Sequence, residues 1–94
     1  MTHETIGAII GELPAVRREG EAYLLAADHE ATFFVGAAGG MLPVGKIHRI
    51  ELRKEFLLLE TLKRERFYFD YADVVGMKID LPEPGKQSHG AGFR

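Results

Sequence analysis

The chain has 94 residues, of which 46% are apolar and 28% charged, a composition typical of one small globular domain. Twelve basic and 14 acidic residues give a formal net charge of −2, which provides no overall positive field to attract nucleic acid. Cysteine is absent, which excludes disulfides and thiolate metal sites, and no apolar run approaches the roughly 20 residues of a membrane-spanning helix.

The N-terminal residues carry no Lys or Arg before their first apolar stretch, unlike a signal peptide, and we expect a cytoplasmic protein without membrane contact. Residues 2–12 fit a short helix, because a threonine can cap it and Ile6, Ile9 and Ile10 share one face. Two glycines weaken that helix, and a strand fits the same residues nearly as well. Residues 15–20 are interpreted as a polar connection.

Two apolar runs follow, over residues 22–27 and 31–35, separated by three polar residues. This arrangement predicts a β-hairpin. A single helix over 21–33 is the alternative, since Glu, Ala and Leu are good helix formers. The Phe-Phe-Val sequence that ends the second run favours the strand interpretation.

The remaining chain alternates between strand-like segments and short connections. Strands are predicted over residues 44–53, 56–62, 66–71 and 74–81. The connections are a glycine-rich turn over 36–40, charged turns over 53–55 and 63–65, and a tight corner over 70–73. We therefore predict a mainly β fold, a five- to six-stranded antiparallel meander or bent barrel with a short N-terminal helix as one interpretation. Residues 1–82 would form this single domain, and residues 83–94 a disordered tail.

Residues 31–81 resemble the Sm-like fold, the small bent barrel of the Sm, LSm and Hfq proteins, or more broadly an SH3-like barrel. The resemblance is carried by Gly45-x-Ile47-x-x-Ile50-Glu51-x-x-Lys54-Glu55-Phe56-x-Leu58. It implies a barrel preceded by a helix. The family's RNA-contacting Asp is replaced by Glu51, and its Met-Asn pair by Lys54 and Glu55. The resemblance thus implies the barrel and not the family's uridine site, because added acids oppose a phosphate-bearing ligand.

Neither the glycines nor the histidines form a recognisable chemical motif. The glycine-rich turn lacks the Lys-Ser/Thr of a phosphate-binding loop, and the four histidines show no metal-ligand spacing. His48 is aligned with Ile50 and Leu52 by strand alternation, which favours a hydrogen-bonded histidine at the rim of the barrel over a catalytic one. We identify no catalytic, cofactor-binding or metal-binding residues, which favours a protein that is not an enzyme. An enzyme that uses His48 with a nearby acid is the remaining alternative.

A set of basic residues forms one candidate binding site, for nucleic acid. Its members are Arg53, Lys54, Lys63, Arg64 and Arg66. If the two charged turns were neighbours, cations and aromatic rings would meet as in single-strand binding proteins. Interleaved glutamates instead favour a solvated surface with cross-strand ion pairs.

Apolar side chains on both faces of the predicted sheet form the second candidate site. Three consecutive leucines at 57–59 and the Phe-Tyr-Phe sequence at 67–69 cannot all face one core. An uncovered apolar patch usually marks a partner. We therefore predict a non-enzymatic interaction module that self-associates or docks on a protein, with nucleic-acid binding as the alternative. The predicted interface residues are Phe56, Leu58, Phe67, Tyr68 and Phe69.

Overall fold

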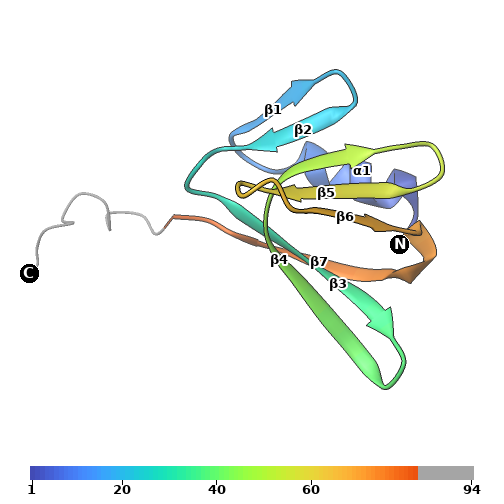
Figure 1. Cartoon of the computed structure of the whole chain (residues 1–94). Coiled ribbons are helices and arrows are strands. Elements are labelled where there is room, and N and C mark those ends of the chain that lie inside the picture. Colours follow the sequence, from blue (N-terminus) through green and yellow to red (C-terminus); the bar gives the residue numbers. More distant parts are fainter. Residues whose placement is uncertain (83–94) are drawn as a thin grey trace, which may run out of the picture.

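A computed structural model describes residues 1–82 as one helix and seven antiparallel strands that curl into a half-barrel (Figure 1). The elements are α1 (His3–Gly11), β1 (Val16–Glu19), β2 (Ala22–Leu25), β3 (Glu30–Ala37), β4 (Gly40–Leu52), β5 (Leu57–Thr61), β6 (Arg66–Phe69), the 3₁₀ turn η1 (Tyr71–Asp73) and β7 (Val74–Asp80). The predicted mainly β, antiparallel fold is confirmed, with seven strands in place of five or six. The predicted tail lies outside the described residues.

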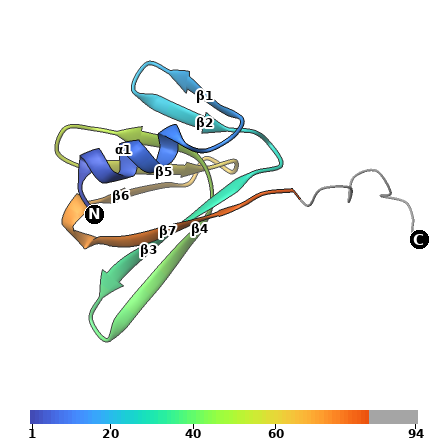
Figure 2. The same cartoon turned by 180° about the vertical axis from the view of Figure 1, so that it is seen from behind.

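The N-terminal residues form a helix, as one of the two interpretations predicted. Thr2 caps it, because its hydroxyl oxygen accepts a hydrogen bond from the Thr5 amide at 3.0 Å. Ile6 and Ile10, one turn apart, are buried in the core. Figure 2 shows α1 lying against the curled sheet next to β5, so the helix covers the inner face of the half-barrel.

Two predictions for the first third of the chain are wrong. Residues 15–20 are not a connection, because Val16–Glu19 is strand β1 and pairs with β2 across a two-residue loop. Gly20 makes that loop tight with a φ of 63°, which few other residues adopt. The segments 22–27 and 31–35 do contain strands, and the helix alternative fails. They do not form a hairpin, since β2 pairs with β1 and β4, and β3 with β4 and β7.

Strand β4 connects the two parts of the sheet. The first half of β4 pairs with β3, and its second half lies between β2 and β5. The main strand order is β1-β2-β4-β3-β7. β5 pairs with the opposite edge of β4, and β6 pairs with β5. Two bulges bend β4. In the first, β4 has one extra residue near Lys46 (φ 60°), opposite the segment from Ala31 to Phe33 of β3. In the second, His48 is the extra residue in the pairing with β5. Sequence alternation cannot reveal these bulges. β4 is also longer than predicted, because residues 40–43 pair with β3.

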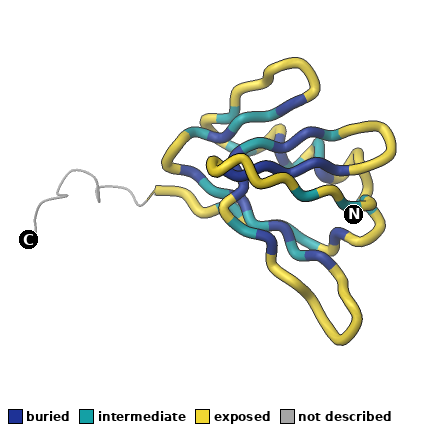
Figure 3. The backbone as a smooth tube through the Cα atoms, in the orientation of Figure 1, coloured by how far each residue is buried: buried dark blue, intermediate teal, exposed yellow. Residues whose placement is uncertain are grey.

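The core lies between α1 and the inner face of the sheet (Figure 3). Its fully buried large side chains are Phe33, Ile6, Ile10, Ile47, Ile50, Leu57, Leu59 and Val74. The predicted charged turns are in place, and η1 forms the predicted corner between β6 and β7. The glycine-rich turn is shorter than the predicted range 36–40, because β3 extends to Ala37 and β4 begins at Gly40, and Gly39 has a φ of 89° in this turn. Among residues 1–82, no helix is long and apolar enough to cross a membrane.

Candidate functional site

The outer face of the sheet, opposite the core, carries two neighbouring rows of side chains that bring basic and acidic residues together. Strand register places Arg17, Leu24, Arg49, Glu60 and Arg66 side by side across β1, β2, β4, β5 and β6. The neighbouring row contains Glu19, Ala22, Glu51, Leu58 and Tyr68. Because side chains two residues apart share a face, opposite charges meet both along and between strands.

Two glutamates hold the centre of this face. Arg49 and Arg53 bind Glu51 at 3.0 and 2.9 Å. Arg64 and Arg66 bind Glu60 at 2.8 and 3.4 Å. The Glu51 and Glu60 side chains are only 12% and 9% exposed, since the arginine side chains lie over them.

The two arginines beside Glu51 favour the ionised form of its carboxylate. Burial of Glu51 acts to raise its pKa, but the hydrogen bonds and charges of Arg49 and Arg53 outweigh burial, and the pKa of Glu51 lies below its ordinary value of 4.5. Glu51 is therefore ionised at neutral pH, and its single charge is shared between the two arginines.

The structure does not bring the five predicted basic residues together. Arg53 and Lys54 precede β5, whereas Lys63, Arg64 and Arg66 follow its other end. Arg53, Arg64 and Arg66 are each paired with a glutamate. Within the described part of the chain, Lys54 and Lys63 make no ion pair. A converging basic surface is thus not formed.

The five predicted interface residues differ widely in accessibility. Leu58 is 5% exposed, so neighbouring side chains of the same molecule already cover it. Phe56 and Tyr68 are 37% and 56% exposed, and their ring centres lie 5.8 Å apart on the outer face. Phe67 and Phe69 are half-buried on the inner face, stacked with ring centres 6.4 Å apart. Sequence reasoning missed Leu62, which is 68% exposed beyond the end of β5.

Strand β6 also has an unprotected edge. Of the other strands in residues 1–82, it pairs only with β5, so the backbone groups of its far edge have no strand partner. Three of its four residues are aromatic, and it contains no proline and no register shift. Its aromatic residues therefore favour pairing of another strand with this edge, although Arg66 at its start is charged.

The other free edges carry features that discourage strand pairing. β1 has four residues, as β6 does, but three of them are charged (Arg17, Arg18 and Glu19). The free half of β4 contains Pro43, which lacks a backbone N–H. In β7, the pairing with β3 is shifted by a bulge, and Lys78 lies near the end of the strand. β6 is the exception among these edges.

His48 does not occupy the position that alternation predicts. The bulge places Ile47 and Ile50 in the core, and His48 is displaced between them, although it is still buried. Its Nε2 lies 3.9 Å from Glu30, and its buried Nδ1 has no hydrogen-bond partner. Shallow hollows of about 330 Å³ lie beside it. In residues 1–82, no three His, Cys, Asp or Glu side chains gather to hold a metal ion.

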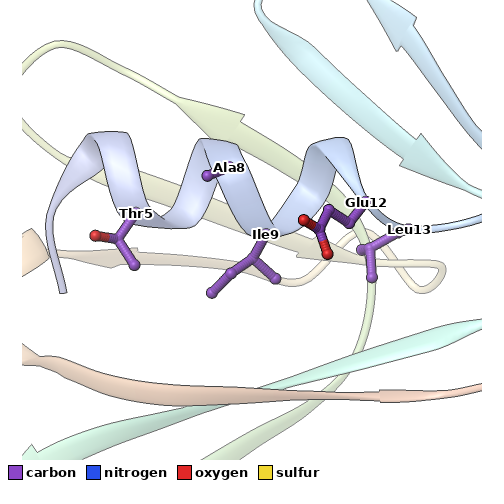
Figure 4. A pocket seen from close by; sticks show the side chains of 5 residues that line it. All are labelled: Thr5, Ala8, Ile9, Glu12 and Leu13. Carbon is purple, nitrogen blue, oxygen red and sulfur yellow. The ribbon is translucent and has the colours of Figure 1, made fainter.

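A hollow of about 410 Å³ lies along α1 and the residues that follow it, lined by Thr5, Ala8, Ile9, Glu12 and Leu13 (Figure 4). It contains one carboxylate and no nucleophile–base pair, so its side chains suggest no reaction. No protein family, curated protein or solved structure was found to match the chain.

Proposed function

We propose that this protein is a non-enzymatic interaction module that self-associates or docks on a protein partner through β5 and β6. The observation that carries the proposal is the free edge of β6, which lacks the protection of the other edges and lies beside exposed aromatic rings. An added strand would satisfy the unpaired backbone groups of that edge.

The outer face supplies the rest of the surface. Phe56, Leu62 and Tyr68 are large apolar or aromatic side chains exposed around β5 and β6. The arginines and glutamates beside them are engaged in ion pairs with one another, and they form a polar rim around the aromatic patch. Leu58 is buried and lies opposite Tyr68 in the pairing of β5 with β6. It would therefore contribute by packing beside Tyr68 rather than by contacting the partner itself.

Nucleic-acid binding, the function of the Sm-like proteins that residues 31–81 resemble, has less support. Three of the five basic candidates are bound to glutamates, and the two charged turns are separated by the length of β5. Binding to a phosphate backbone would have to compete with those ion pairs.

The test is the mass of the full chain in solution, measured by light scattering up to about 1 mM because a small interface is weak. We expect a mass above that of the monomer, or a co-purifying protein, and a loss of either in Tyr68→Asp. Val75→Asp is the matched control, because Val75 is 51% exposed but lies on β7.

A monomer at every concentration with no co-purifying protein would overturn the proposal. With three tyrosines and no tryptophan, bound nucleic acid would dominate the ultraviolet spectrum. A spectrum of that kind, lost at high salt, would support the alternative function instead.

A further inference from the structure

The segment from Arg66 to Asp70 is complementary to itself about Tyr68. If two copies lie antiparallel with Tyr68 facing Tyr68, then Arg66 faces Asp70 of the second copy and Phe67 faces Phe69. We propose that β6 is the interface of a symmetric dimer in which two copies pair in this register, a proposal that rests on the proposed function. A two-fold interface requires a surface that complements itself, and this segment meets the requirement.

The backbone is suited to this pairing. β6 pairs with β5 through residues 66–69, and Asp70 continues the extended conformation with φ −71° and ψ 138°. Five consecutive residues can therefore enter an antiparallel ladder with a second copy. The sheet would then run from β5 and β6 of one molecule into β6 and β5 of the other.

Side chains on both faces would meet across the dimer axis. On the inner face, the stacked Phe67 and Phe69 rings are half-buried, and in the dimer Phe67 of each copy would face Phe69 of the other. On the outer face, Tyr68 would face its own copy. Aromatic cross-strand pairs are among the favourable contacts of a β-sheet.

The charged residues at the two ends retain capacity for a new ion pair. Arg66 contacts Glu60 through its Nε, and its side chain is still 48% exposed. Asp70 is exposed, and its Oδ1 accepts a hydrogen bond from the Ala72 amide at 3.3 Å. A foreign strand would need the same order of charges and rings, whereas a second copy provides it by symmetry.

Charge exchange tests the register. Alone, Arg66→Glu would place acid against Asp70, and Asp70→Lys would place Lys against Arg66, and we expect each variant to weaken the dimer about tenfold. Mixed in equal amounts, the two variants form a heterodimer with Glu against Lys at one end and Asp against Arg at the other. We expect the mixture to recover the dimer of the original chain, because a folding defect would not be repaired by mixing.

A cross-link tests the same register without altering a charge. Facing residues of antiparallel strands have Cα atoms about 4.5–5.5 Å apart, a separation that a disulfide spans. Since the chain has no cysteine, Tyr68→Cys should give covalent dimers under mild oxidation. Val75→Cys, which is similarly exposed on β7, should remain uncross-linked.

The outcomes separate this inference from the proposed function. A dimer or a protein complex that needs Tyr68, but shows no rescue in the mixture and no cross-link at position 68, would overturn the β6 register and leave the interaction module standing. A chain that is monomeric and without a partner would overturn both. Rescue together with the cross-link would establish the symmetric β6 interface.

Discussion

The two faces of β5 are both buried, but by different means. Leu57 and Leu59 face α1 and the core, where fixed helix and strand residues enclose them completely. Leu58 and Glu60 face outward and are covered by long side chains of neighbouring strands, chiefly arginines and an aromatic ring. The inner face is therefore rigidly packed, whereas the outer face is covered by side chains that can rearrange.

The largest expected effect tests the rigidity of the inner face. Leu59→Ala should lower the free energy of unfolding by about 3–5 kcal/mol, because the helix and sheet around it cannot close the cavity. Leu58→Ala, only one residue away, should cost about 2 kcal/mol, the low end for a buried leucine, since mobile side chains can collapse into the space. Urea unfolding of both variants measures the difference. Equal losses would contradict the distinction between the two faces.

The ion pairs of the outer face give the next largest effect. Glu51→Gln should lower the free energy of unfolding at neutral pH by about 1–2 kcal/mol, because Arg49 and Arg53 lose a charged partner but remain partly exposed to water. Glu55→Gln serves as the control, since Glu55 is exposed. A loss equal to that of the control would show that the network does not stabilise the fold.

The same carboxylate predicts a pH dependence. The folded-state pKa of Glu51 lies below its ordinary value of 4.5, so its stabilising contribution is complete above about pH 4.5 and is lost as the pH falls through the lower, folded-state value. The stability difference between the original chain and Glu51→Gln should therefore shrink in acid. A difference that stays constant from pH 7 to about pH 2 would contradict this account.

Sequence reasoning gave the strands from residue 30 onward, because their alternation and turns are local signals. It could not find β1, since Val16-Arg17-Arg18-Glu19 is mostly polar and becomes a strand only by pairing with β2. It could not assign the partners of β2 either. β2 pairs with β1 and with the second half of β4, whereas β3 pairs with the first half of β4, and the bends in β4 that allow this leave no local signal. Apolarity on both faces of β5 and β6 was correctly recognised, but Leu58 proved to be covered within its own molecule.

Breaking the hydrogen bond between η1 and the connection from β4 to β5 should lower stability by a smaller amount. The Tyr71 hydroxyl donates a hydrogen bond to the Arg53 carbonyl at 2.6 Å, which fastens η1 to the connection between β4 and β5. Tyr71→Phe should lower the free energy of unfolding by about 1 kcal/mol. Tyr23→Phe is the control, because the Tyr23 hydroxyl makes no hydrogen bond within residues 1–82. Equal melting temperatures of the two variants would show that the hydrogen bond of Tyr71 does not stabilise the fold.

The smallest expected effect is that of replacing His48, and it is a gain in stability rather than a loss. Unlike Glu51, His48 is a buried polar group with a ring nitrogen that lacks a partner, and its other nitrogen is 3.9 Å from Glu30, too far for a hydrogen bond. His48→Leu should therefore raise the free energy of unfolding by about 0.5–1 kcal/mol, because an unsatisfied polar group is replaced by an apolar one. His29→Leu should lower it, since the His29 Nδ1 has a partner in Asp28 at 2.8 Å. A marked loss of stability in His48→Leu would contradict this account.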